Sequence, residues 1–98
     1  MKKHIFDKFV DTICSHTNLN KEDIFTKTKQ ADIVLARQTL FYVCHQRGLT
    51  KTMIGQYMNE DGYDIGSPAV SYGISIINSM IEKDPDFRVI IDKVSHID

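Results

Sequence analysis

The stretch from Asp23 to Gln38 constrains the fold of this chain more than any other segment. A short apolar turn, Ile24-Phe25, leads into a basic loop that carries Lys27 and Lys29. The loop opens directly into a long run whose apolar residues recur at the three-to-four spacing of an amphipathic helix. No alternating run of β-branched residues bracketed by a two-residue turn occurs in the sequence. The sequence therefore predicts an all-α protein.

Apolar spacing and helix-capping residues together predict a compact domain of six helices. The predicted helices cover residues 4–16, 21–26, 31–47, 51–59, 68–83 and 85–95. Asn20 and Thr50 are expected N-caps, and Gly48 suits the left-handed position that ends a helix. Ser67-Pro68 and Asp84-Pro85 each combine an N-cap side chain with a proline at the first helical position, where its missing N–H is not needed.

Charge is distributed unequally along the chain, which at 98 residues has the size of one domain, expected over residues 1–98. Nine basic and five acidic residues occur up to Lys51, whereas three basic and eight acidic residues follow it. No lysine or arginine occurs between Thr52 and Glu82. A nucleic-acid-binding surface is therefore expected to be built mainly from the first half.

The sequence argues against membrane insertion and against a metal site. No segment approaches the ~20 apolar residues that span a bilayer, and Asp7, Lys8 and Asp11 interrupt the N-terminal run, which excludes a signal peptide. We therefore expect a soluble, cytoplasmic protein. Cys14 and Cys44 are predicted to be reduced thiols that fill core space. Their neighbouring histidines stand one or two positions away on a helix and face elsewhere, so neither metal nor cofactor is expected.

Four motifs follow one another in a specific order. They are Asp23-Ile24-Phe25-Thr26-Lys27-Thr28-Lys29, Ile33-Val34-Leu35-Ala36-Arg37-Gln38, Gly48-Leu49-Thr50 with Ile54-Gly55, and Glu82-Lys83-Asp84-Pro85-Asp86-Phe87-Arg88. They are similar to the Asp-Leu-Leu-Ser-Lys-x-Arg, Ile-Val-x-Ala-Arg-Gln, Leu-Ser-x-x-Glu-Ile-Gly and Asp-Pro-x-x-Arg motifs in the C-terminal DNA-binding domain of the bacterial replication initiator DnaA. One such motif is a weak signal, but four in the correct order and spacing are specific. The resemblance extends from the first predicted helix to the last and implies a Trp-repressor-like helix-turn-helix domain.

The resemblance also implies where double-stranded DNA would be bound. Lys29 stands where the family has an arginine that enters the minor groove, and lysine supplies the charge there without the flat guanidinium fork. Arg47 adds a basic group that could contact the DNA backbone. The remaining positions correspond to phosphate contacts or to the turn beside the duplex: Lys27, Gln38, His45, Thr50, Lys51 and Thr52.

The segment that reads bases departs from the family pattern. Where the family has Arg-Asp-His-Thr-Thr-Val, this chain has Ile65-Gly66-Ser67-Pro68-Ala69-Val70, and the preceding 60–66 loop is longer and acidic. Pro68 and Ala69 have no side-chain hydrogen-bonding group, although Ala69 could touch a thymine methyl. Because each bidentate base contact provides roughly 1–3 kcal/mol of discrimination, recognition of the family's own DNA site is not expected. The replacement readers are Ser67, Ser71, Tyr72 and Ser75.

Structural roles are an alternative for several of these residues. Arg37 could pack its aliphatic stem in the core and pair with an acidic partner instead of contacting DNA. Lys27 and Lys29 could belong to a merely solvated loop. Tyr63 and Tyr72 are interpreted as packing or rim residues rather than base-stacking platforms. The acidic loop is most simply a solvated turn, but at the reading helix it would repel phosphate.

Catalysis is not expected from this sequence. It has no Gly-rich phosphate-binding loop with a lysine, so neither nucleotide binding nor the initiator's ATPase activity is expected. The spacing of its serine, histidine and aspartate residues does not assemble an activated nucleophile.

Two functions are compatible with the resemblance. The favoured hypothesis is a stand-alone double-stranded DNA-binding protein that grips the backbone, has altered or reduced sequence specificity, and acts in replication or its regulation. The alternative is a protein–protein interaction module that keeps the fold but has lost DNA binding, with a partner in a replication or transcription assembly. The missing base-reading signature and the lysine- and arginine-free segment motivate the alternative.

Overall fold

The computed structural model describes residues 2–96 and contains six helices over that range. They are α1 (Lys2–Thr17), α2 (Lys21–Ile24), α3 (Ala31–Gln46), α4 (Lys51–Glu60), α5 (Ser67–Lys83) and α6 (Pro85–Ser95). No strand occurs between residues 2 and 96, so the predicted all-α fold is confirmed. None of these helices is both long enough and apolar enough to span a lipid bilayer.

Several helices begin and end where the local chemistry predicts. Thr50 caps α4, because its hydroxyl oxygen accepts a hydrogen bond of 3.1 Å from the Met53 N–H. Asp84 caps α6 in the same way, with its carboxylate accepting from the N–H groups of two residues in the first turn. Gly48 follows the end of α3 with a φ of 106°, the left-handed conformation that glycine adopts without strain.

The predicted cap of α5 is wrong by one residue. The N-cap is Gly66, because the N–H groups of Ala69 and Val70 both donate to the Gly66 carbonyl. Ser67 and Pro68 therefore already lie in the first turn of α5. The Ser67 side chain is consequently exposed at the start of the helix instead of closing it.

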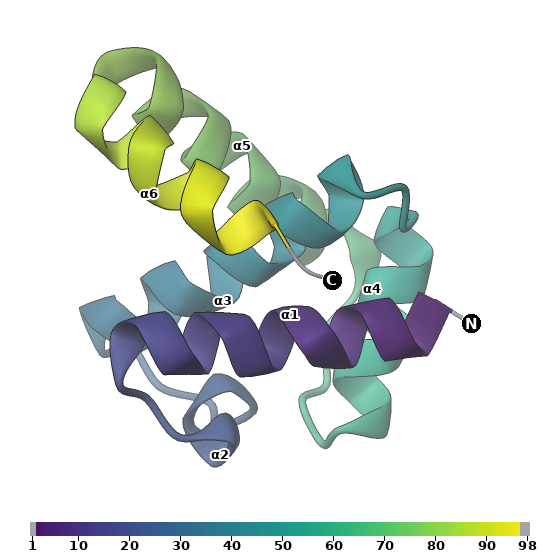
Figure 1. Ribbon diagram of the computed structural model, residues 1–98. Coiled ribbons are helices and arrows are strands. Elements are labelled where there is room, and N and C mark those ends of the chain that lie inside the picture. The colour runs from purple at the N-terminus through teal and green to yellow at the C-terminus, as the bar shows by residue number, and fades with distance from the viewer. Residues whose placement is uncertain (1, 97–98) are drawn as a thin grey trace.

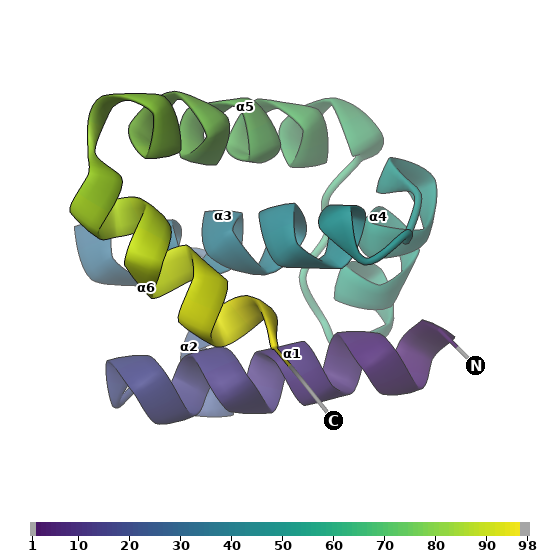
Figure 2. The same cartoon turned by 45° about the horizontal axis from the view of Figure 1, so that its top comes forward.

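Helix α3 is the centre of the fold and contacts each of the other five helices. Figure 2 shows it between α5 on one side and α1 on the other, with α6 crossing over the layers. Figure 1 shows α4 near the N-terminal end of α1. One hydrophobic cluster takes buried side chains from all six helices, including Phe6, Ile24, Leu40, Ile54, Ile77 and Ile91.

The two cysteines differ in burial, which corrects the expectation that both fill the core. Cys44 is fully buried in the cluster, whereas Cys14 is only half-buried at its edge. Burial raises the pKa of the Cys44 thiol far above its ordinary value, so this thiol stays protonated and unreactive.

A close approach between α3 and α5 fixes the position of α5. A Cβ atom at Gly73 would lie 2.9 Å from Cδ2 of Phe41 and 3.2 Å from Cγ of Gln38. Because even the smallest side chain would push these atoms, glycine lets α5 pack directly against the middle of α3. The remaining faces of α5 are thereby oriented for contacts outside the core.

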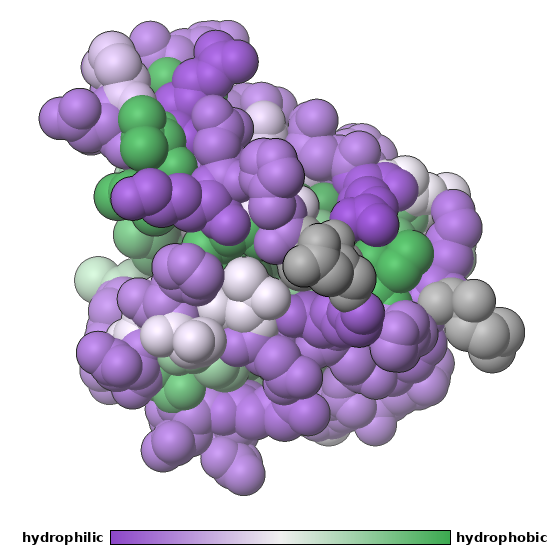
Figure 3. Space-filling model, in the orientation of Figure 1, coloured by the Kyte–Doolittle hydropathy of each residue, from purple (hydrophilic) through white to green (hydrophobic). Residues whose placement is uncertain are grey.

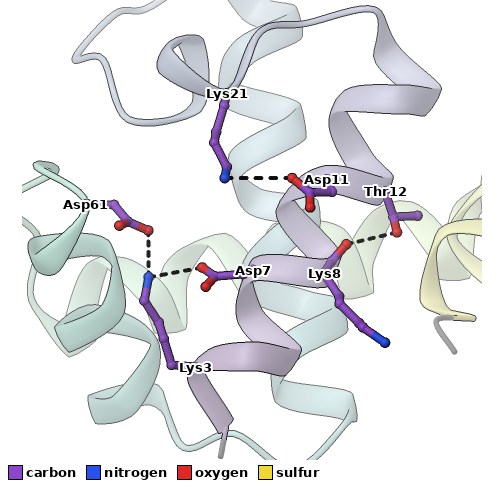
Figure 4. Close-up of polar contacts among 7 residues, drawn as sticks. All are labelled: Lys3, Asp7, Lys8, Asp11, Thr12, Lys21 and Asp61. Atoms are coloured by element: carbon purple, nitrogen blue, oxygen red, sulfur yellow. Dashed lines mark hydrogen bonds and ion pairs between the residues drawn. The ribbon is translucent and has the colours of Figure 1, made fainter.

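The N-terminal end of α1 holds the connection between α4 and α5 (Figure 4). The Lys3 ammonium donates to the Asp61 carboxylate at 2.8 Å and to the Asp7 carboxylate at 3.0 Å. Burial by itself lowers the pKa of Lys3, but the hydrogen bonds and charges of the two aspartates outweigh it and raise the pKa overall. Lys3 and Asp61 therefore tie the acidic loop to α1.

Candidate nucleic-acid interface

Arg37, in the middle of α3, anchors the start of the basic loop. Its Nε donates to the Ile24 carbonyl at 2.9 Å and its Nη2 donates to the Thr26 carbonyl at 2.7 Å. The guanidinium also lies over the Tyr63 ring, 4.4 Å from the ring centre. The structure thus assigns Arg37 a structural role, but its partners are two carbonyls and an aromatic ring rather than the expected acidic side chain.

The environment of Arg37 suits a permanently charged group. The residue is only 5% exposed, and this burial lowers the pKa of its guanidinium, while Tyr63 acts in the opposite direction. An arginine keeps its proton at neutral pH, because its ordinary pKa lies far above neutrality. A charged guanidinium therefore connects the end of α2, the basic loop and the loop in front of α5.

The basic loop displays its two lysines to solvent. Lys27 and Lys29 are exposed, and neither forms an ion pair with an acidic side chain in the described range 2–96. Lys3 and Lys21 differ, because Lys3 is paired as above and Lys21 lies 3.8 Å from the Asp11 carboxylate (Figure 4). The charges of Lys27 and Lys29 are therefore available to an anionic partner.

A groove at the start of α4 and α5 brings together half of the predicted site residues. Its volume is about 550 Å³, and Gly48, Leu49 and Pro68 contribute to its lining. The predicted residues that line it are His45, Thr50, Lys51, Thr52, Ser67 and Ser71. A cation, several hydroxyls and the N-terminus of α4 thus share one concave surface, a combination that suits phosphate oxygens.

Two hydrogen bonds shape this first groove. The half-buried Lys51 ammonium donates to the Ser71 hydroxyl oxygen at 3.0 Å and thereby connects α4 to α5. Nδ1 of His45 lies 3.1 Å from the Leu49 carbonyl oxygen and fastens the turn between α3 and α4. Since an ammonium has three donors, Lys51 can hold Ser71 and contact a phosphate at the same time.

A second, smaller groove lies on the other flank of α5, towards the basic loop. Its volume is about 240 Å³, and Thr28, Gln38, Tyr63, Ala69 and Gly73 are among its lining residues. Helix α5 therefore forms a ridge between two hollows, with Lys51 in the first and Thr28 of the basic loop at the second. A ridge of this kind has the shape that fits into the major groove, which is about 12 Å wide.

Five predicted site residues line neither groove. Lys27 and Lys29 lie on the exposed loop, and Arg47 is exposed at the C-terminal end of α3. Tyr72 and Ser75 lie on the outer face of α5, where Tyr72 is 64% exposed. The structure therefore distributes the predicted residues over a loop, the C-terminal end of α3, a groove on each flank of α5 and the ridge between them.

Asn59 is a supporting residue that the sequence did not reveal. Its side-chain amide donates to the Ile65 carbonyl and accepts from the Ile65 N–H, both at 3.2 Å. This pair of hydrogen bonds holds the loop immediately before α5. No local signal predicts it, because an exposed asparagine near a helix end is ordinary and its partner lies in an irregular segment.

The family comparison agrees with this geometry. The model of the bacterial dnaA protein helix-turn-helix matches residues 6–62, more than half of the chain. The chain belongs to the bacterial DnaA helix-turn-helix family. No curated protein and no solved structure matches it.

Membership in the DnaA helix-turn-helix family makes this a domain of a DNA-binding type. The match includes the basic loop, the anchoring Arg37 and the turn before α4, so the resemblance predicted from these motifs is confirmed. The fourth motif, at residues 82–88, and the whole of α5 lie outside the matched range.

The acidic loop of this DnaA-family domain is more ordered than a solvated turn. Tyr63 packs on Arg37, Ile65 is half-buried, and Asp61 is bound by Lys3. The prediction that Tyr63 is a packing residue is confirmed. Pairing with Lys3 also offsets one of the negative charges that the sequence places just before α5.

Proposed function

We propose that this protein binds double-stranded DNA, holds the backbone through the basic loop and the first groove, and acts in DNA replication or its regulation without catalysing a reaction. The proposal rests on Lys27 and Lys29, which are exposed and have no ion-pair partner within residues 2–96. Both lie on a loop that Arg37 fixes beside α5. A mobile basic tail would need no such buried anchor. Family membership supports the same reading.

Backbone contacts would come from both sides of α5. On one side, Lys29 would enter the minor groove as a point charge and Lys27 would contact phosphate. On the other side, Lys51 and the hydroxyls of Thr50 and Thr52 line the first groove, next to the N-terminus of α4. Arg47 would provide a further phosphate contact from the end of α3.

Reduced or altered sequence specificity is part of the proposal. From Ser67 to Ile77, α5 contains no arginine, lysine, asparagine, glutamine, histidine, aspartate or glutamate. These are the side chains that make the strong hydrogen-bonded contacts to base edges in the major groove. Affinity should therefore come mainly from backbone contacts, which carry no sequence information directly.

A salt titration tests this proposal. In a mobility-shift assay, the protein should retard a duplex at low salt, and log affinity should fall against log salt with a slope of roughly −3 to −4, as three or four neutralised phosphates require. Failure to retard any duplex even at low salt would refute DNA binding. A slope near zero with binding retained would refute the proposed backbone grip.

The second candidate function is the protein-interaction module. A hollow of about 300 Å³ lies between α1, α3 and α6 and is lined mainly by apolar side chains. Ile90, which lines the hollow, and its neighbour Val89 on α6 are each more than half exposed. Figure 3 shows apolar, green surface along α6 and in the recess next to it. A defined oligomer by light scattering, together with no binding of DNA, would favour this candidate.

A further inference from the structure

We infer that α5 recognises DNA through the 5-methyl groups of pyrimidines, carried by thymine or by 5-methylcytosine. The inference rests on the proposed function and specifies what the reading helix detects. In the major groove a pyrimidine methyl is an apolar feature, which an apolar side chain can recognise without a hydrogen bond.

The outer face of α5 forms a continuous strip in which most of the side chains are apolar or aromatic. At the helical repeat, Pro68, Tyr72 and Ser75 lie along one line, and Ala69 lies beside it. All four residues are exposed, and Tyr72 is 64% exposed. The opposite side of the helix is buried against the core. This strip is therefore the part of α5 that the floor of a major groove would meet.

Two serine hydroxyls on this part of α5 are already engaged within the protein. The Ser75 hydroxyl donates to the Tyr72 carbonyl of its own helix at 2.7 Å. The Ser71 hydroxyl oxygen accepts from the Lys51 ammonium at 3.0 Å. Hydrogen-bonded reading of bases by Ser71 and Ser75 is thus restricted, whereas the Ala69 methyl, the Pro68 ring and the Tyr72 ring remain available for apolar contact.

The placement of Lys51 and of the basic loop supports contact between this strip and the bases. Lys51 lies in the groove on one flank of α5, and Thr28, from the basic loop, lines the groove on the other flank. Backbone contacts from both flanks would hold the helix with its outer face toward the bases. Tyr72, in the second turn, would then be the residue best placed to cover a methyl group.

Paired duplexes that differ only in the methyl group test the inference. The first pair is an alternating adenine–thymine duplex and the same duplex with uracil in place of thymine. The second pair is an alternating guanine–cytosine duplex and its 5-methylcytosine form. We expect about fourfold weaker binding for each buried methyl that is removed. If α5 covers one or two methyl groups, the methylated duplex should bind about fourfold to fifteenfold more tightly than its partner. Comparison of the two pairs shows which methylated base is preferred.

Two variants assign the preference to the proposed residues. Tyr72→Ser should lower the methylated-to-unmethylated ratio by about fourfold, the effect of one methyl group that is no longer covered. Val89→Ser removes a similarly exposed apolar side chain from α6 and should leave the ratio as it is in the unaltered protein. A ratio that Tyr72→Ser leaves unchanged would attribute the preference to duplex shape and overturn the inference. Equal binding of both members of each pair would also overturn the inference, but it would leave the proposed function intact. Failure to bind any duplex would overturn the inference and the proposed function together.

Discussion

Replacing Arg37 with alanine should lower the free energy of unfolding by about 3 kcal/mol, a large share of the stability of a small domain. The substitution removes two hydrogen bonds from a charged donor and leaves the Ile24 and Thr26 carbonyls without that partner. It also removes the cation–π contact with Tyr63. Urea unfolding followed by circular dichroism measures the change.

Two further variants show whether this effect belongs to the guanidinium fork. Arg37→Lys should recover less than half of the lost stability, because one ammonium on a shorter stem does not reproduce the fork that reaches both carbonyls. Arg47→Ala changes an exposed arginine just after the same helix and should alter stability by less than about 0.5 kcal/mol. A loss below about 0.5 kcal/mol for Arg37→Ala would contradict the anchoring role.

Reversing the charge of both loop lysines, Lys27→Glu with Lys29→Glu, should weaken duplex binding by about a hundredfold at moderate salt. Two phosphate contacts are lost, and two carboxylates are placed against the backbone. The slope of log affinity against log salt should also become shallower by about two. Fluorescence anisotropy with a labelled duplex measures both quantities.

The matched control reverses Lys83 and Lys93 together, which changes the net charge equally at exposed positions of α5 and α6. Its affinity should fall by no more than about threefold, because salt screens charges that do not contact the duplex. Both double variants should unfold at the same urea concentration as the unaltered protein. An equal loss in the two would mean that only net charge matters and would contradict a fixed basic loop.

The helices could be predicted well because their signals are local. Thr50 and Asp84 bond to N–H groups within three residues, and Gly48 supplies the left-handed conformation by itself. Predicted ends agree with the observed ones to within two residues. One N-cap was predicted wrongly, at Ser67 instead of Gly66. Glycine is also accepted as an N-cap, and with Gly66 in that position Pro68 still lies in the first turn, where proline is tolerated.

The architecture of the site could not be predicted to the same degree, because it depends on contacts between distant segments. The anchoring of the basic loop by Arg37 joins residues 11 and 13 positions apart, and the tie between Lys3 and Asp61 joins residues 58 positions apart. Periodicity and capping contain no information on such pairs. The resemblance supplied the candidate positions, and tertiary packing decided which of them share a groove.

The most direct test of DNA binding through this surface is an NMR titration of the ¹⁵N-labelled protein with a short duplex. We predict amide shift changes at residues 27–30, 50–52, 67 and 69–75, with the amides of α6 unchanged. Absence of any change at low salt would contradict DNA binding. Changes confined to α6 and its apolar hollow would contradict the proposed interface, because the duplex would then contact the protein away from the basic loop, the first groove and α5.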